Sequence, residues 1–304
     1  MNEWESISHC TLCPRACGAD RRDGKTGLCG SSGRVKIARA DLHRWEEPCI
    51  SGDRGSGTVF FSGCPLHCVF CQNRQISGGQ VGWEVTPEEL AETFLALQEK
   101  GAANINLVTP GHFAVPVAEA IRRAREQGLS VPVICNSGGY ERVETLKRWE
   151  GLVDVYLPDF KYMDPALAAR YSHAPDYPDR AKEALAEMVR QTGPCVFDGE
   201  GYIRRGTIVR HLVLPGHTRD SRAVVEYLYR TYGDGMYLSL LNQYTPMEWM
   251  RGDPELGRKV TRREYERVVD FALDLGVVNG FVQEGETASE SFIPPFTEKP
   301  PEGK

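Results

Sequence analysis

Three cysteines lie close together at positions 64, 68 and 71, with the spacing C-x3-C-x2-C. They follow residues 58–62, a β-branched and aromatic run that is typical of a strand. An iron–sulfur cluster with four irons needs four ligands, so three cysteines leave one iron open to another molecule. An open coordination position indicates a reactive centre rather than a structural one. The alternatives are a zinc site completed by His67 and three unrelated cysteines.

Four more cysteines form a second group nearer the N-terminus: Cys10, Cys13, Cys17 and Cys29. Glycines between and beside them indicate tight turns, and a segment of ~35 residues is too small for a hydrophobic core of its own. Four thiolates hold either a zinc ion, which would fold such a segment, or an auxiliary iron–sulfur cluster. The spacing does not decide between the two, and unliganded thiols are a third interpretation. The remaining cysteines are isolated, which is more typical of packing: Cys49, Cys135 and Cys195.

The composition narrows the classes of function. Of 304 residues, 41% are hydrophobic and 26% are charged, which is ordinary for a folded globular chain. The net charge of −6 argues against a nucleic-acid partner, and no run of ~18 apolar residues indicates a membrane span. We find no secretory signal, so we expect a cytoplasmic protein whose seven clustered cysteines serve as metal ligands rather than disulfides. Residues 9–44 hold eight Lys and Arg against three Asp, which indicates a solvated basic face or a docking site for an acidic substrate.

Predicted strands and helices alternate from residue 58 onward. The strands are expected at 58–62, 104–109, 131–136, 153–160, 208–214, 236–242 and 281–283. The helices are expected at 87–100, 115–127, 141–149, 164–171, 179–191, 219–232 and 262–275. This order predicts an α/β fold, a parallel partial (β/α)6-type barrel with an N-terminal Cys-rich knob. We assign residues 1–50 to the metal-binding knob, 51–292 to the barrel and 293–304 to a disordered tail.

Polar residues follow several of the predicted strands, at the face where such barrels carry their working residues. Asp159 and Lys161 follow the fourth strand, where a carboxylate and an ammonium suit an amino-acid-like ligand. Arg210 and His211 alternate on the fifth strand, so only one of them is expected to point into the barrel. Further candidates after other strands are Thr109, His112, Asn136, Ser137, His217, Gln243 and Tyr244. We expect Gln243 and Tyr244 to contact the substrate.

The cysteine loop and six further stretches resemble a known family. The loop, with Phe70 before its third cysteine, is similar to that of the radical S-adenosylmethionine (SAM) superfamily. Other stretches resemble its uncharacterised pyruvate formate-lyase activating enzyme-like branch: Glu46-Glu-Pro-Cys-Ile-Ser-Gly52, Gly55-Ser-Gly-Thr-Val-Phe-Phe-Ser-Gly-Cys64, Asn104-Ile-Asn-Leu-Val-Thr-Pro110, Val153-Asp-Val-Tyr-Leu-Pro-Asp-Phe-Lys161, Arg210-His-Leu-Val-Leu-Pro-Gly216 and Asn242-Gln-Tyr-Thr-Pro246. Together these stretches and the N-terminal cysteines span residues 10 to about 295.

The resemblance implies a [4Fe-4S] cluster on Cys64, Cys68 and Cys71, whose open iron takes the amino and carboxylate groups of SAM. One electron then cleaves the sulfonium and yields a 5′-deoxyadenosyl radical, which abstracts hydrogen. By analogy, Phe70 is expected to contact the adenine. Many members have Gly-Gly-Glu after the second strand, which binds the amino group of SAM. This chain departs from that pattern with Thr109-Pro-Gly-His112, and Thr109 and His112 are expected to take over the task.

The remaining cofactor residues are also placed by the resemblance. Asn136 and Ser137 are expected to bind the ribose hydroxyls or the carboxylate of SAM. Asp159-Phe-Lys161 resembles the Asp-x-Lys of glycyl-radical activases, which lies near the cofactor. His217 follows a Pro-Gly pair where activases often place a cofactor-side residue.

Three classes of function follow from these expectations. The first is an activase that abstracts hydrogen from a glycine of a partner enzyme. The second is a radical enzyme that modifies a small molecule or another peptide. The third is a non-catalytic iron–sulfur protein for electron transfer or binding, against which the set of strand-end residues argues. An enzyme of either of the first two classes implies an electron donor such as flavodoxin or ferredoxin, a possible protein or peptide substrate, and no nucleic acid or membrane partner.

Overall fold

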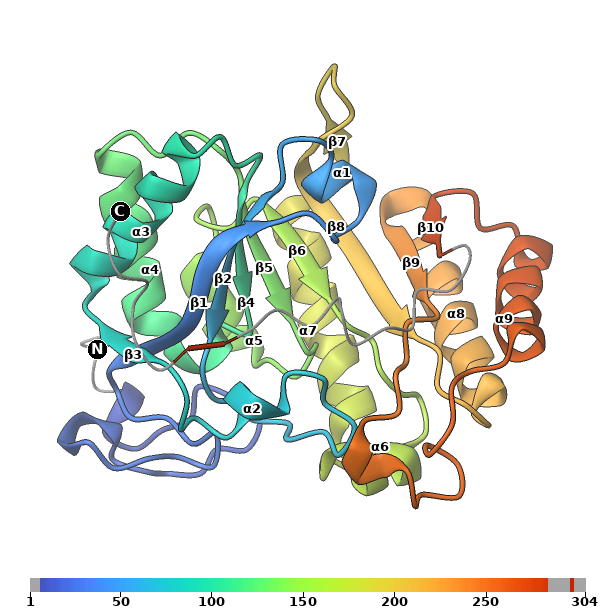
Figure 1. Ribbon diagram of the computed structural model, residues 1–304. Helices are drawn as coiled ribbons and strands as arrows, with labels where there is room; N and C mark the ends of the chain where they lie inside the picture. The colour runs from blue at the N-terminus through green and yellow to red at the C-terminus, as the bar shows by residue number, and fades with distance from the viewer. Residues whose placement is uncertain (1–5, 284–295, 298–304) are drawn as a thin grey trace.

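The computed structural model describes residues 6–283 and 296–297. Its strands, drawn in Figure 1, are β1 Val35–His43, β2 Ser56–Phe61, β3 Trp83–Val85, β4 Ile105–Val108, β5 Val133–Ser137, β6 Val155–Pro158, β7 Val196–Phe197, β8 Ile203–Leu212, β9 Tyr237–Leu241 and β10 Gly280–Val282. Its helices are α1 Pro48–Ser51, α2 Arg74–Ser77, α3 Pro87–Glu99, α4 Ala114–Glu126, α5 Val143–Leu146, α6 Pro165–Ser172, α7 Tyr177–Thr192, α8 Thr218–Tyr232 and α9 Arg262–Leu275.

The strands form one open sheet in the order β10-β9-β8-β6-β5-β4-β2-β1-β3. From β2 to β10 every neighbouring pair is parallel, whereas β1 is antiparallel to both β2 and β3. The short strand β7 forms an antiparallel hairpin with β8. In the described part of the chain β3 and β10 are the two edges and do not pair with each other. The predicted α/β partial barrel is therefore confirmed.

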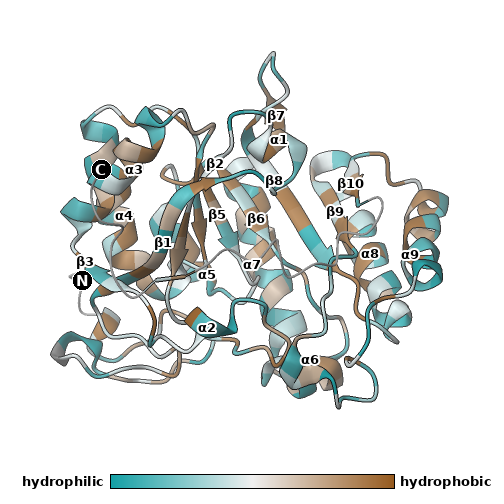
Figure 2. Ribbon diagram, viewed as in Figure 1, coloured by the Kyte–Doolittle hydropathy of each residue, from teal (hydrophilic) through white to brown (hydrophobic). Residues whose placement is uncertain are grey.

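The inner strands and the helices on them follow from simple sequence signals. All six residues of β2 are buried, as expected for a parallel strand covered on both faces. Helix α3 begins with a capping box, in which Thr86 accepts from the Glu89 amide and the Glu89 carboxylate accepts from the Thr86 amide. Figure 2 shows mostly apolar inner strands, coloured brown, whereas the surrounding helices carry both apolar and polar residues. These elements fix the strand ends, where the predicted site residues lie.

The N-terminal half contains elements that were not expected from the sequence: β1 and the short elements α1, α2 and β3. Strand β1 lies within residues 1–50 and pairs with β2, so the sheet begins before residue 51. The expected helix 141–149 is divided into α5 and a 3-10 turn, Lys147–Trp149. Of the tail assigned to 293–304 only Phe296 and Thr297 belong to the described residues, and the ring of Phe296 packs edge-on against Phe60. No helix among residues 6–283 is long and apolar enough to cross a membrane.

Candidate active site

A cavity of about 510 Å³ opens at the carboxyl ends of the parallel strands. Its size suits a small-molecule site, which usually occupies such a crevice in α/β folds. Residues from the ends of β2, β4, β5, β6, β8 and β9 contribute to one wall or another. The sequence-predicted residues among its lining are Cys64, Cys68, Phe70, Cys71, Thr109, Asn136, Ser137, Asp159, Lys161, Arg210, Gln243 and Tyr244.

The three cysteines of the loop after β2 all line this cavity. Burial is the main cause that raises the pKa of Cys64 to about 11 and that of Cys71 to about 12, and the neighbouring Cys68 adds to both. Without a metal these two thiols therefore stay protonated, and a cation is needed to hold them as thiolates. Cys68 Sγ lies 2.9 Å from Ser172 Oγ, at the end of α6. The donor set fits an iron–sulfur cluster bound by three thiolates.

None of the ten cysteines forms a disulfide. Within residues 6–283 and 296–297, no three His, Cys, Asp or Glu side chains are arranged so that they could hold one metal ion. A four-iron cluster binds each thiolate through a different iron, so its ligands need not converge on a single ion.

Asp159 and Lys161 form an ion pair on the cavity wall beyond β6. Burial alone would lower the pKa of Lys161, but the Asp159 carboxylate outweighs it and the pKa is raised. The amide of Lys161 is held by the hydroxyl of Tyr177, 2.9 Å away. The cavity thus contains a fixed ammonium and a fixed carboxylate, as an amino-acid group requires.

A backbone hydrogen bond joins the ends of β4 and β5 at the cavity wall. Thr109 N donates to Asn136 O at 2.7 Å, and both residues line the cavity together with Ser137. Thr109 has a φ of 59°, a left-handed conformation that is unfavourable for a β-branched residue. Such strain is typical of functional sites, where surrounding contacts hold it.

Phe70 lies on the cavity wall between two tyrosines. Its ring packs edge-on against Tyr171 and Tyr244, with centroids 6.4 and 6.0 Å apart. Tyr244 is itself fixed, because its hydroxyl donates to Leu256 O at 2.6 Å. This packing holds an apolar ring beside the cysteine loop, where an aromatic or apolar ligand surface could contact it.

The two other predicted cofactor histidines do not line the cavity. His112 is buried under the loop, where its Nε2 donates to Ser62 O at 2.9 Å, and burial lowers its pKa to about 3. His217 lies outside the cavity lining, and its Nε2 is 2.9 Å from the Tyr171 hydroxyl. His67 also lies outside the lining, and its Nε2 donates to Leu28 O at 2.7 Å.

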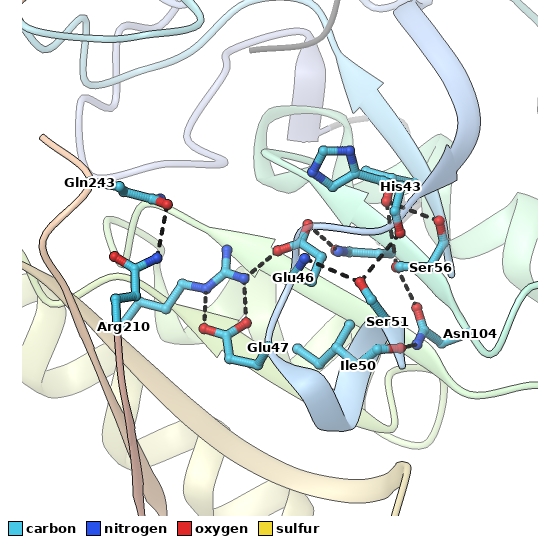
Figure 3. A network of polar contacts seen from close by, with 12 residues as sticks. His43, Glu46, Glu47, Ile50, Ser51, Ser56, Asn104, Arg210 and Gln243 are labelled. Atoms are coloured by element: carbon cyan, nitrogen blue, oxygen red, sulfur yellow. Dashed lines mark hydrogen bonds and ion pairs between the residues drawn. The ribbon is translucent and has the colours of Figure 1, made fainter. Parts of the chain in front are cut away.

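A charged cluster beside the Asp159–Lys161 pair, where the backbone of Asp159 pairs with that of Arg210 of the neighbouring strand, was not expected from the sequence. Arg210 forms ion pairs with both Glu46 and Glu47, the residues just before α1, as Figure 3 shows. The side chains are nearly buried, with exposed fractions of 13%, 7% and 4%. Asn106 Nδ2 donates to Glu46 Oε1 at 3.0 Å. Arg210 is thus the member of the Arg210–His211 pair that points into the cavity, while His211 Nδ1 donates to Phe160 O.

Amide side chains adjoin this charged cluster. Gln243 Oε1 accepts from Gln283 Nε2 at 3.0 Å, and Gln243 O accepts from Gln72 Nε2 at 3.2 Å. All three glutamines line the cavity. They link the cysteine loop, which contains Gln72, to the last two strands of the sheet.

Glu141 is a second residue that sequence reasoning missed. It is buried just behind Ser137, and burial raises its pKa to about 7. Its Oε2 has no hydrogen-bond partner among the described residues. A buried carboxyl next to a cavity is a recurrent functional signal, but nothing in the sequence distinguishes Glu141 from a helix-start residue.

The N-terminal cysteines lie within residues 9–34, which precede β1 and contact the cysteine loop. The name knob refers to this shorter segment from here on, because β1 belongs to the sheet. Cys10 and Cys29 are buried, and a Cβ on Gly27 would stand 3.1 Å from Cys17 Sγ and 3.6 Å from Cys29 Sγ. The electrostatic neighbours of the Cys13 thiol include the other three. The structure thus brings the four cysteines of the second group together.

The chain is similar to proteins of one superfamily. The family model described as "Radical SAM superfamily" matches residues 58–228. The uncharacterized protein MJ0674 of Methanocaldococcus jannaschii is 27% identical over 279 residues, which are 88% of this chain and 75% of that protein.

Solved structures share the fold at low identity. Streptococcus suis SuiB bound to precursor peptide SuiA is 12% identical, with a TM-score of 0.51 over 73% of this chain and 46% of that one. This chain thus matches less than half the length of SuiB. Methylornithine synthase (PylB) is 13% identical, with a TM-score of 0.50 over 79% of this chain and 73% of that one. The family match covers more than half of the residues and includes the three-cysteine loop, so the chain belongs to the radical SAM superfamily, which implies a [4Fe-4S] cluster and SAM as cofactors.

Proposed function

We propose that this protein reductively cleaves SAM and uses the resulting radical to abstract hydrogen from a small molecule or a peptide side chain held in the same cavity. The observation that carries the proposal is the cavity itself, whose lining combines the three loop thiols, the Asp159–Lys161 pair and the charged cluster around Arg210. When bound, the cluster and SAM supply the electron and the 5′-deoxyadenosyl radical. The chain supplies binding, orientation and shelter from water.

The residues around the cysteine loop suit the parts of SAM. Lys161 presents an ammonium to a carboxylate, and Asp159 presents a carboxylate to an ammonium. Asn136 and Ser137 offer hydrogen bonds to ribose hydroxyls, and Phe70 offers an apolar ring to the adenine. Glu141 lies behind Ser137, and its carboxyl forms a hydrogen bond with the Ser137 hydroxyl.

The charged cluster around Arg210 suits a cationic or hydrogen-bond-donating substrate. Among the residues that the structure describes, the charged groups that line the cavity are Glu46, Glu47, Asp159, Lys161 and Arg210, three carboxylates against two cations. Since Asp159 and Lys161 pair with each other, the excess carboxylate belongs to the cluster around Arg210. A buried excess charge is costly unless a ligand of opposite sign compensates it. We therefore propose a substrate with an amine or another cationic group.

A partner protein follows from the same chemistry. Reduction of the cluster requires a one-electron donor, and we propose a flavodoxin or a ferredoxin for this role. An oxygen-sensitive cluster with an open iron also favours a reducing compartment, which supports a cytoplasmic location.

The first test is formation of 5′-deoxyadenosine. Protein reconstituted with iron and sulfide under anaerobic conditions, and reduced with dithionite, is expected to convert SAM to 5′-deoxyadenosine and methionine. Cys64→Ala, Cys68→Ala and Cys71→Ala should each abolish the product. Cys195→Ser, outside both cysteine groups and the cavity lining, is the matched control and should retain it. Undiminished cleavage by any one loop variant would refute the assignment.

The second test addresses the substrate. Diamines and basic amino acids are expected to stimulate 5′-deoxyadenosine formation, while dicarboxylates of similar size should not. Glu46→Gln should weaken the stimulation without removing basal cleavage. Stimulation by dicarboxylates alone, or a glycyl radical formed on a partner protein without any effect of amines, would overturn the proposed substrate class.

A further inference from the structure

We propose that Cys10, Cys13, Cys17 and Cys29 hold a second iron–sulfur cluster, and that the hydrogen bond between Cys29 and Cys64 links it electronically to the cluster of the barrel. The electron acceptor in this proposal is the barrel cluster, so the relay rests on the proposed function, whereas the site itself does not. Four observations on the knob and its contacts lead to it.

The first observation is the way the backbone gathers the thiols. Cys10 N donates to Ala19 O and Gly18 N donates to Cys10 O, both at 3.0 Å, so the first and third cysteines are held on one tight loop. Gly27 lies between the third and fourth cysteines, since a Cβ at position 27 would stand tightly against Cys17 Sγ, at 3.1 Å, and in ordinary contact with Cys29 Sγ, at 3.6 Å. The buried apolar cluster around Cys10 and Cys17 is small, with Ile7, Leu12 and Val115 as its other members, which is typical of a knob that a metal centre stabilises.

The second observation is a buried cation in the middle of the knob. Arg21 is 1% exposed, and its guanidinium donates to Ser31 O, Ser32 O and His112 O and lies 3.6 Å from Cys10 Sγ. In the part of the chain that the structure describes, no Asp or Glu forms an ion pair with Arg21. A buried positive charge is costly without a counter-charge. Four thiolates on a metal centre carry net negative charge, and Arg21 is placed to balance it.

The third observation is the contact between the two cysteine groups. The amide of Cys64 donates to the carbonyl of Cys29 at 3.1 Å. A residue that binds one centre is thus joined by a single hydrogen bond to a residue that binds the other. A second hydrogen bond joins the same two segments, because His67 Nε2 of the cysteine loop donates to Leu28 O of the knob.

The fourth observation is how closely the two segments are seated. Gly63 has a φ of 92°, and a Cβ there would stand 2.2 Å from Ser31 Oγ and 2.6 Å from Cys29 O. Only glycine allows this approach without displacing the knob. The position before the first loop cysteine is therefore shaped by the knob.

The hydrogen bond between Cys29 and Cys64 favours an iron–sulfur cluster over a zinc ion in the knob. A zinc ion is redox-inactive and could only brace the knob, whereas an iron–sulfur cluster accepts and releases one electron. In the relay, a reduced flavodoxin or ferredoxin loses one electron to the knob cluster. The knob cluster then passes that electron to the barrel cluster and returns to its oxidised state. No proton or bond changes hands in either transfer.

The site is tested in the full chain with the barrel ligands removed. The triple variant Cys64→Ala/Cys68→Ala/Cys71→Ala, reconstituted anaerobically, is expected to keep about four irons and four sulfides per chain and the EPR signal of one reduced cluster. About one zinc per chain without sulfide, or no metal at stoichiometric level, would overturn the proposal. Wild-type protein that fails to cleave SAM while the triple variant keeps its cluster would instead refute the proposed function alone.

The relay is tested by the rate at which the barrel cluster is reduced. Cys13→Ala/Cys17→Ala should slow its reduction by reduced flavodoxin or ferredoxin at least tenfold, while reduction by dithionite, a small diffusible donor, stays unchanged. Cys195→Ser is the control with a cysteine removed elsewhere. Equal rates with the protein donors in the double variant and wild type would overturn the electronic link.

The charge balance is tested by three arginine variants. Arg21→Gln should shift the one-electron reduction equilibrium of the knob cluster about tenfold toward the oxidised form, which corresponds to about 59 mV. Arg21→Lys keeps the charge and should keep most of the potential. Arg22→Gln, at an exposed neighbour paired with Asp20, should leave it unchanged. The same potential in Arg21→Gln as in wild type would refute the role of Arg21.

Discussion

Arg210 is the only positive charge in a nearly buried cluster of three ionic side chains in the cavity, together with Glu46 and Glu47. Its Nε donates to Glu47 Oε1 at 2.8 Å, and its Nη2 contacts both carboxylates. Arg210→Gln removes the cation and leaves two carboxylates facing each other away from bulk water. We expect this substitution to be among the more destabilising in the protein.

The magnitude follows from the burial of the three side chains. Removing one partner of a buried ion pair costs about 3–5 kcal/mol, because the remaining charge is desolvated without compensation. The cluster borders a cavity that admits water, so we expect the lower end, a loss of about 3 kcal/mol in the free energy of unfolding at pH 8. The double variant Arg210→Gln/Glu47→Gln should recover part of this loss, since it removes one of the stranded carboxylates.

The effect should depend on pH with a definite sign. Burial alone would raise the pKa of Glu47, but Arg210 outweighs it and the pKa is lowered. In the wild type this carboxylate therefore stabilises the fold above its unfolded pKa, and the contribution is lost as the pH falls through the folded pKa. Without Arg210 burial dominates, the folded pKa rises above the unfolded one, and the variant regains stability as the pH falls. The gap between variant and wild type should narrow from pH 8 to pH 5.

Urea-induced unfolding of the reconstituted proteins under anaerobic conditions, followed by tryptophan fluorescence, measures this gap at both pH values. Arg262→Gln is the control, because Arg262 pairs with Glu266 on the exposed face of α9 and should change stability little. An Arg210→Gln loss that is equal at pH 5 and pH 8, or one no larger than that of Arg262→Gln, would show that the cluster is not a desolvated ion pair.

Three further predictions address other parts of the site. Because burial raises the pKa of Glu141 to about 7, wild-type stability should fall as the pH rises from 5 through 7. Glu141→Gln should remove that fall in thermal melts, and the same pH profile in the variant as in the wild type would contradict the prediction. Lys161→Met leaves Asp159 without its partner and should weaken SAM binding by roughly tenfold or more in equilibrium dialysis, whereas Lys182→Met on the outer face of α7 should not. Gly63→Ala would place a Cβ 2.2 Å from Ser31 Oγ and should lower the melting temperature and iron content together; normal values of both would exclude the tight seating of the knob.

The fold was largely predictable because its inner elements carry strong local signals. The apolar run of β2 and the capping box of α3 each specify one element within a few residues, and short connections then order the parallel sheet. Strand β1 was missed although Val35, Ile37, Ala40 and Leu42 are apolar. The reason is a register shift between Ile37 and Arg39, which breaks the alternation that reveals a strand.

Residues of the candidate site were predictable only where the end of a parallel strand alone determines where the residue lies. Asn136, Ser137 and Lys161 come together because parallel strands end at one edge, which the chain order already implies. The direction in which the His112 side chain points was not predictable, because the 3-10 turn Gly111–Phe113 turns its ring into the protein interior. Glu46 reaches the cavity from a loop between β1 and α1, and no periodicity places a loop residue beside Arg210 of β8, which is five strands from β1 in the sheet.

The contact between knob and cysteine loop also bears on how the protein can be divided. The loop amide of Cys64, the ring of His67 and the carbonyl of Pro65 all find their hydrogen-bond partners in residues 15–29. A barrel expressed without those residues would carry these polar groups with no partner at the place where the first cofactor must assemble. The two segments therefore behave as one cooperative folding unit, and neither could be exchanged between relatives, or lost in evolution, as an independent module.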